Sequence, residues 1–463
     1  MKQSQQTEQL KGMIGLEIHT YILTKEKLFC KCLASRERGL KPNTNICPIC
    51  TGQPGAKPML PNKTAIEKAI QIGLMLKCNI NTFLPWQRKH YNWPDMPKGF
   101  QSTLSGKHAT PLAVKGRFMG INITSMHLEE DPASWDPETG EVDYNRSGLP
   151  LVEIITDPDF QTSEEVTNWL TNLLHNLAYL KTVDSNAGIK VDVNVNIPGK
   201  TERVEMKNIN SIENIGLAIN YELKRHSIEE QRTMETRRFD PVKMLTIKMR
   251  SKEEADDYRF IVDPDLQPII LSNKMIESIK STLPESPEEK LKKMIKRFKI
   301  DEKNASILTK NIDVALFFEK IVEKVDPKFA LSWVTIELLR FLNYNKTTLD
   351  KVEINPEHFI ALLKLVKEGK ITELQGKQLL NQFYPKSFNP INIEGKITDK
   401  KELEEIARRA IKQNSKAVQD YNAGEQKALD FLMGEIMKIT NRRADYKIAR
   451  EVLQNLLKEN KKR

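Results

Sequence analysis

The sequence predicts an α+β protein: a mainly antiparallel sheet with helices in the first 295 residues, followed by two helical domains. In the first part, short alternating segments and amphipathic helical repeats follow one another irregularly, unlike the regular order of a doubly wound fold. Past Pro284 the pattern is helical, rich in Lys, Glu, Leu and Ile, and interrupted by a Pro/Asn/Gly loop at 385–395. We therefore expect domains at residues 1–295, 296–395 and 396–463.

The expected strands share a period of two, which places successive side chains on opposite faces of a sheet. They are residues 15–23, 121–130, 149–155, 190–197 and 203–207. Helices are expected between them. Residues 63–76 repeat isoleucine and leucine at helical spacing, Thr162 and Glu165 form a capping box, and Ser211 opens a further helix.

Composition and charge limit the class of protein. Of the 463 residues 39% are hydrophobic and 29% charged, as in soluble globular proteins. No apolar run is long enough to span a bilayer, and residues 1–11 lack a signal-peptide pattern, so we expect a cytoplasmic protein without membrane contact. The net charge is +10, and residues 401–463 carry 15 basic and 10 acidic side chains. This favours a polyanionic partner, although a solvated lysine-rich surface is an equal alternative.

Four of the five cysteines lie within one short stretch. Cys30 and Cys32 are separated by one residue, Cys47 and Cys50 by two, and the pairs by 14. In a cytosolic chain this spacing predicts a structural Zn²⁺ site with four sulfur ligands. The alternative is a set of reduced free cysteines. Cys78 stands alone, and we expect it to be a buried apolar residue.

The predicted strands carry an unusual number of carboxylates on their polar faces. One such strand is an ordinary surface strand, but five gathered on one sheet face would repel each other unless divalent ions intervened. Oxygen-rich sites suit Mg²⁺ or Mn²⁺, and imidazole is tolerated. The candidate ligands are Glu17, His19, Glu129, Glu153, Asp192 and Glu205.

Cations come from three segments that we expect to be loops, residues 88–101, 143–148 and 250–259. Each of them alone is also typical of a plain turn or charged helix start. With metal ions, such cations would suit phosphoryl transfer.

The sequence has neither a Walker A run nor a kinase glycine-rich loop, so no nucleotide motif identifies ATP. It also lacks an amidase signature.

Several motifs resemble the GatB family, the B subunits of glutamyl/aspartyl-tRNA amidotransferases. They are GLEIH at 15–19, the cysteine set with GxPG at 52–55, RKxYxxPDxPKG at 88–99, HLEED at 127–131, DYNR at 143–146, ExKNxNS at 205–211, ETR at 235–237 and RSKE at 250–253. Residues 414–434 resemble the YqeY-like end of the same family. The resemblance thus extends over nearly the whole chain.

This resemblance implies a glutamine synthetase-like cradle with a zinc knuckle, then a helical domain and a small YqeY-like tRNA-binding tail. It implies ATP, Mg²⁺ and structural Zn²⁺ as cofactors. In the implied reaction, ATP phosphorylates the side-chain carboxylate of misacylated Glu-tRNA(Gln) or Asp-tRNA(Asn), and ammonia then displaces phosphate. The expected partners are an amidase (the A subunit), a small linker protein (the C subunit) and the misacylated tRNA.

Site roles are carried over by position. The resemblance implies Glu17, His19, Glu129 and Glu153 as Mg²⁺ ligands, with Asp192 and Glu205 as second choices. It implies that the catalytic residues are Glu129, Lys98, Arg146 and Lys207, the three cations contacting phosphate or the ammonia channel. Residues 132–135 read Pro-Ala-Ser-Trp where many family members have Ala-Gly-Lys, so one frequent cation is missing. Met234 and the Arg-Phe pair at 238–239 also depart from the family pattern.

Two other functions fit parts of the sequence. One is a ligase that acts on a free amino acid, and the other is a zinc-stabilised RNA-binding protein without catalysis. A basic tail is unnecessary for a free amino acid, which argues against the first. Carboxylates repel phosphate unless metal intervenes, which argues against the second.

Overall fold

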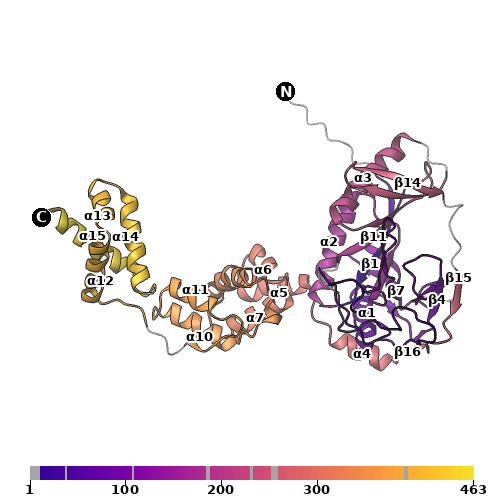
Figure 1. Ribbon diagram of the computed structural model, residues 1–463, viewed down its shortest axis with the longest axis horizontal. Helices are drawn as coiled ribbons and strands as arrows, with labels where there is room; N and C mark the ends of the chain where they lie inside the picture. The colour runs from indigo at the N-terminus through magenta and orange to yellow at the C-terminus, as the bar shows by residue number, and fades with distance from the viewer. Residues whose placement is uncertain are drawn as a thin grey trace. The chain divides into compact units, whose positions relative to one another are not determined.

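The computed structural model describes residues 11–36, 39–106, 109–183, 188–229, 233–251, 259–390 and 395–462. Most of the predicted cationic segment at 250–259, namely residues 252–258, lies outside this part of the chain. The chain forms two compact units, Met1–Glu285 and Ser286–Arg463 (Figure 1). In the residues described, no helix has both the length and the apolar character needed to cross a membrane.

The first unit is built on a 12-stranded sheet. Its strands are β1 (Met13–Tyr21), β2 (Asn79–Ile80), β4 (Gln87–His90), β5 (Phe100–Thr103), β6 (Ala113–Phe118), β7 (Ile121–Glu130), β10 (Pro150–Thr156), β11 (Ile189–Asn196), β12 (Val204–Ile209), β13 (Glu235–Asp240), β14 (Leu245–Ser251) and β15 (Arg259–Val262). The order is β14-β13-β12-β11-β1-β10-β7-β5-β4-β15, with β6 on β7 and β2 on β6. Among these pairs only β12–β13 is parallel, so the predicted mainly antiparallel sheet is confirmed. Two small ribbons pair β3 (Phe83–Leu84) with β16 (Ile269–Ile270) and β8 (Ser134–Trp135) with β9 (Val142–Asp143).

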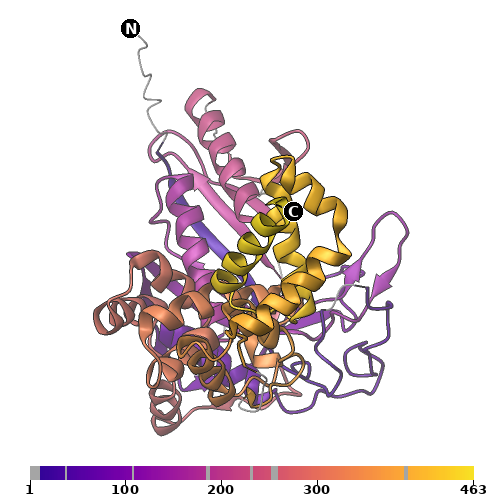
Figure 2. The same ribbon diagram turned by 90° about the vertical axis from the view of Figure 1, so that its left-hand side faces the viewer.

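Helices pack on the apolar face of the sheet. They are α1 (Lys63–Met75), α2 (Ser163–Tyr179) and α3 (Ile212–Ile228), and α4 (Asn273–Ser281) packs against α1. Helix α3 contacts α2 and β11, and the two long helices lie side by side (Figures 1 and 2). Leu16, Ile18 and Val193 are almost completely buried beneath them, and burial of each such side chain contributes about 1.5–3 kcal/mol. The capping box of Thr162 and the Ser211 cap are both present, as predicted.

The second unit is helical, which confirms the prediction for residues past 284. Its helices are α5 (Pro287–Phe298), α6 (Glu302–Leu308), α7 (Ile312–Val322), α8 (Pro327–Ser332), the π-helix η2 (Trp333–Leu338), α9 (Leu339–Tyr344), the 3-10 helix η3 (Leu349–Lys351), α10 (Pro356–Lys367), α11 (Glu373–Asn381), α12 (Lys400–Gln413), α13 (Ser415–Asn422), α14 (Gln426–Ile439) and α15 (Tyr446–Lys462). They enclose two separate apolar cores. One runs from Met294 to Phe383 and the other from Ile397 to Leu457.

The segment at 88–101, expected as a loop, begins and ends in strands. Strand β4 pairs with β5 and also with β15, about 170 positions later in the chain. The local sequence does not predict that β4 is a strand, because hydrogen bonds to a strand far away in the chain help to stabilise it. Only residues 91–99 between the two strands form an irregular connection.

Candidate functional site

Polar side chains of neighbouring strands lie on the sheet face opposite the helices. The register pairs His19 of β1 with Glu153 of β10, and Glu153 with His127 of β7. One step along β1, Glu17 is opposite Asp192 of β11. Residues directly opposite in a sheet share a face, so these rows form one continuous polar surface. The predicted candidate ligands on β1, β7, β10 and β11 therefore lie on one face.

The closest group of carboxylates is formed by Glu17, Asp192 and Glu205. One oxygen from each lies within 4.8 Å of the others. The Lys207 ammonium lies 2.8 Å from Asp192 and 2.7 Å from Glu205. Burial and the nearby charge of Glu153 raise the pKa of Glu17. Three hard oxygen donors in a half-buried position fit Mg²⁺. The family resemblance implies Glu17 as a metal ligand, and Asp192 and Glu205 only as second choices.

His19 and Glu153 form an ion pair beside this carboxylate cluster, with 3.3 Å between Nε2 and Oε1. Burial disfavours the imidazolium, yet the hydrogen bond and charge of Glu153 raise the pKa of His19. Burial likewise opposes the carboxylate, but His19 holds the pKa of Glu153 below its ordinary value. Metal binding at His19 would therefore compete with protonation of the imidazole.

Glu129 is buried and held by three donors that the sequence did not reveal. Its carboxylate accepts hydrogen bonds from Thr103 Oγ1 at 2.5 Å, Ser105 Oγ at 2.9 Å and Gln101 Nε2 at 3.1 Å. Thr103 of β5 is directly opposite Glu129 in the sheet. The polar residues at alternate positions from 101 to 105 are a period-two signal, but it becomes recognisable only once β5 is known to be a strand.

Lys98 and Arg146 pair with the carboxylates that follow Glu129. Lys98 forms an ion pair with Glu130, and its ammonium lies 5.0 Å from the Phe100 ring centroid. Lys98 also lines a cavity of about 150 Å³ on the side of the cysteine loops. Arg146 Nε lies 2.9 Å from Asp131. Of the three predicted cations, therefore, only Lys207 contacts the carboxylate cluster.

The segment that departs from the family pattern is held by Arg146. The guanidinium donates to the carbonyl of Pro132 at 3.1 Å and to that of Ala133 at 2.7 Å. Ala133 is fully buried, and its amide donates to the Asp95 carbonyl at 2.8 Å. The side chain of Arg146 thus places a cation beside residues 132–135, although these residues contain none.

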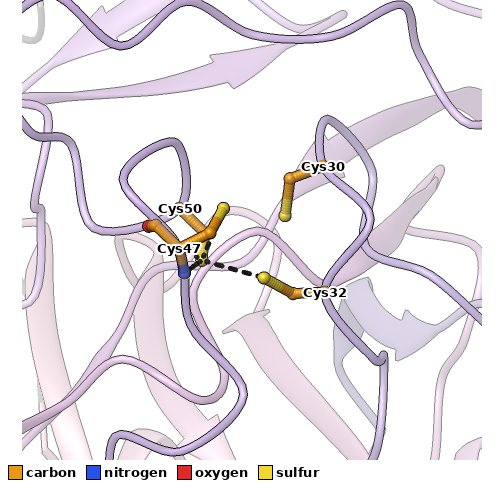
Figure 3. A group of neighbouring side chains, drawn as sticks. All are labelled: Cys30, Cys32, Cys47 and Cys50. Carbon is orange, nitrogen blue, oxygen red and sulfur yellow. Dashed lines mark hydrogen bonds between the residues drawn. The ribbon is translucent and has the colours of Figure 1, made fainter.

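The four clustered cysteines come together from two loops (Figure 3). All four sulfur atoms lie within 4.8 Å of one another. Cys50 Sγ is 3.9 Å from Cys47 Sγ and 4.0 Å from Cys32 Sγ. A tetrahedral zinc site with Zn–S bonds of about 2.3 Å requires sulfur–sulfur distances of about 3.8 Å. The geometry therefore fits zinc.

Local interactions favour the thiolate form of Cys50. The hydrogen bond with Cys30 is the largest cause, and the Cys47 amide and the Lys27 charge add to it against burial, which lowers the pKa of Cys50 to about 5. The Lys27 ammonium lies 3.5 Å from the sulfur. Thiolates are the form that binds metal. Cys78 is buried elsewhere, as expected, and burial raises the pKa of its thiol to about 12.

Residues 143–148 brace the cysteine loops. Asn145 Oδ1 accepts hydrogen bonds from the amides of Thr44 and Asn45, both at 2.8 Å. The hydroxyl of Ser147 donates to the Cys50 carbonyl at 2.7 Å. This segment, predicted as a source of cations, therefore contributes chiefly to the scaffold, and Arg146 is its cationic side chain.

The fold and site define a class: an α+β protein with an acidic sheet face and a four-sulfur group, joined to a helical C-terminal part. Residues 12–277 match the family model of the GatB/GatE catalytic domain, and residues 316–457 match that of the GatB domain. The chain belongs to the GatB family, as its motifs predicted.

Curated relatives agree along almost the entire chain. The B subunit of aspartyl/glutamyl-tRNA(Asn/Gln) amidotransferase from Methanococcus maripaludis (strain C6) is 41% identical, over 97% of this chain and 99% of the relative. The protein of the same name from Methanocaldococcus jannaschii is 41% identical, over 97% and 98%. That of Methanothermobacter thermautotrophicus is 39% identical, over 93% and 97%. The predicted enzyme class, one component of a tRNA-dependent amidotransferase, is confirmed.

Proposed function

We propose that this chain is the kinase and transamidase component of a tRNA-dependent amidotransferase that acts on Glu-tRNA(Gln), Asp-tRNA(Asn) or both. The observation that carries the proposal is the single acidic sheet face, with Glu17, Asp192 and Glu205 within 4.8 Å of one another. An acidic face without bound cations would repel a phosphorylated substrate, so this face is expected to bind divalent ions. The names of the relatives supply the substrate class.

The proposed chemistry has two steps. A carboxylate is a poor electrophile, so the terminal phosphoryl group of ATP is first transferred to a side-chain oxygen of the esterified amino acid, which gives an acyl phosphate and ADP. Ammonia then attacks the carbonyl carbon, loses a proton and displaces phosphate, which leaves the amide. We propose that a partner amidase, the A subunit, supplies the ammonia and that a small linker protein, the C subunit, joins the partners.

The residues of the face have distinct proposed tasks. Glu17, Asp192 and Glu205 would hold Mg²⁺, which neutralises phosphate charge when it is bound. The adjacent pair of His19 and Glu153 would complete the metal-binding surface, together with Glu129. Lys207 remains the candidate for phosphate contact next to the metal. Lys98 and Arg146, farther along the face, remain candidates for phosphate or channel contact.

The remaining parts of the proposal concern the scaffold. We propose structural Zn²⁺ at Cys30, Cys32, Cys47 and Cys50, supported by sulfur distances that suit tetrahedral coordination. The three-domain division at 295 and 395, with a glutamine synthetase-like cradle and a YqeY-like tail, is part of the same proposal. The tail carries a net charge of +5 between residues 401 and 463 and would bind tRNA. Charged tRNA as substrate makes the cytoplasm the proposed location.

Glu129→Gln tests the function. The substitution removes a buried negative charge from the face but keeps the side-chain size. We expect ATP-dependent phosphorylation of Glu-tRNA to fall by about a hundredfold or more, while tRNA binding by the assembled complex changes little. Glu138→Gln, at an exposed carboxylate, is the control for charge alone.

The assay also separates the rival functions. Full activity of the Glu129→Gln variant would contradict the role of the acidic face. Equal amidation of free glutamate would favour a ligase that acts on free amino acids. Binding of tRNA without ATP hydrolysis by the wild-type complex would favour a binding protein.

A further inference from the structure

A fully buried lysine lies against the cysteine cluster. Lys27 is in the segment after β1, three residues before Cys30, and only 1% of it is exposed. Its ammonium donates to Cys50 Sγ at 3.5 Å and to the Tyr144 carbonyl at 3.3 Å. In the described part of the chain, no carboxylate forms an ion pair with it. The Cys50 sulfur is therefore the group in contact with this ammonium that can carry a negative charge.

Metal binding would leave the cysteine cluster negatively charged. Cysteine binds metal as a thiolate, so four ligands carry four negative charges, of which a divalent ion cancels two. Cys30 and Cys50 are buried, and a buried net charge is costly unless it is paired. The Lys27 ammonium lies where it can offset part of the remaining charge.

Neutral thiols would suit Lys27 less well. A thiol sulfur is a weak acceptor, and an ammonium buried beside uncharged thiols would have no ionic partner there. Gly148 closes the site from a third direction, with a φ of +82°. A Cβ on Gly148 would lie 3.5 Å from Cys50 Cβ and 3.7 Å from Lys27 Cδ. The contacts of Lys27 thus fit the metal-bound, thiolate form of the cluster.

We infer that Lys27 is the charge partner of a metal ion bound by four thiolates, and a positioning residue for the ligand Cys50. A hydrogen bond from outside the ligand set orients a metal ligand and tunes its electron density. The same ammonium holds the Tyr144 carbonyl, so it also joins the cluster to residues 143–148. The inference rests on the zinc site of the proposed function and not on the amidation reaction. None of the sequence motifs contains Lys27.

Zinc transfer from the loaded full-length chain to a chromogenic chelator tests the inference. Lys27→Met nearly keeps the length of the side chain but removes the charge and the donor. It should weaken zinc binding about 10- to 100-fold, the usual effect of losing such an outer hydrogen bond. Lys31→Met is the matched control, because it removes the same charge at an exposed position between Cys30 and Cys32. It should change the zinc affinity by less than about threefold, since solvent and salt screen an exposed charge.

Cobalt in place of zinc separates a charge partner from a packing role. Every variant should keep the d–d absorption of a tetrahedral thiolate site, because the four ligands remain. In Lys27→Met the sulfur-to-cobalt charge-transfer band should move to lower energy, because no cation then stabilises the thiolate electrons. Lys27→Gln should show the same shift and serves where the methionine variant folds poorly. Lys27→Arg keeps the charge and should keep the band near the wild-type energy.

Unchanged zinc affinity and charge-transfer energy in Lys27→Met would overturn the inference. An equal band shift in Lys27→Met and Lys27→Arg would do the same, because the effect would then come from packing rather than from charge. So would a full-length chain that retains neither zinc nor cobalt. None of these measurements requires turnover. If Lys27 behaves as described but the complete enzyme amidates no tRNA, the proposed reaction fails while the charge partner stands.

Discussion

Glu222→Gln should destabilise the first unit in a pH-dependent way. Glu222 of α3 is fully buried. Its carboxylate lies 2.7 Å from Arg225 and 3.2 Å from His226 on the same helix, and 3.2 Å from Arg237 of β13. The Thr246 hydroxyl of β14 donates to it. The carboxylate thus fastens α3 to β13 and β14, which continue the sheet beyond the strand of Glu205 and Lys207.

The size of the effect follows from proton affinity. Burial opposes the charge, but hydrogen bonds from His226, Arg225 and Thr246 lower the pKa of Glu222 from 4.5 to about 2. Since a tenfold change in proton affinity corresponds to about 1.4 kcal/mol, the charged form contributes about 3 kcal/mol at pH 7. The folded pKa lies below the unfolded one. This stability is therefore present above pH 4.5 and is lost as the pH falls toward 2, with about 1 kcal/mol left at pH 3.

Urea unfolding at pH 7 and pH 3 measures this contribution. The difference between wild type and Glu222→Gln should be about 3 kcal/mol at pH 7 and should shrink to about 1 kcal/mol at pH 3. Glu229→Gln is the control, because Glu229 contacts the same Arg225 at 3.4 Å but is 63% exposed. It should change stability by less than about 1 kcal/mol. A Glu222→Gln difference that is absent at pH 7, or equal at both pH values, would refute this reasoning.

Three further predictions concern the metal sites and the tail. Replacing Cys47 and Cys50 by serine should lower zinc content, by elemental analysis, and melting temperature together; unchanged zinc would place the ion elsewhere. Lys207→Met should strengthen Mn²⁺ binding, measured by electron paramagnetic resonance, because it removes the ammonium that competes for the carboxylates; weaker binding would contradict that competition. Truncation after residue 395 should weaken tRNA binding and reduce its salt dependence. Equal binding by the truncated chain would show that the tail makes no contact.

The sequence predicted which residues share the polar face because strand geometry alone determines that. Glu17 and His19 alternate with buried apolar residues, so any strand through them exposes both on one side. Their partners were beyond local prediction. Asp192 and Glu205 join Glu17 because β11 and β12 follow β1 in the sheet order, and that order depends on long-range pairing. The strand order and register were therefore needed to see which of the candidate ligands lie closest together.

Interactions between distant segments explain what the sequence did not reveal. The donors to Glu129 come from β5, whose four residues contain no recognisable strand pattern on their own, and from Ser105 just after it. Arg36 reaches Tyr21 from the loop after Cys32, and no local repeat marks its position. By contrast, the cysteine spacing alone predicted that the four sulfur atoms lie together, as they do in the structure, because few arrangements of two such pairs suit a metal site.

The acidic sheet face suits the proposed reaction only together with cations, because both of its reactants are anions. A carboxylate and a phosphate 4 Å apart repel by about 4 kcal/mol in a medium with an effective dielectric constant of 20. Acidic side chains can relieve this repulsion only through bound metal, whereas the Lys207 ammonium beside Asp192 and Glu205 would relieve it directly. A face with carboxylates alone would bind metal but leave part of the phosphate charge unopposed. If phosphate binds next to the metal, metal affinity and phosphate affinity should each increase when the other ligand is present, as binding linkage requires. Calorimetric titration of Mg²⁺ with and without phosphate measures this coupling, and the absence of any coupling would mean that the two ligands bind independently.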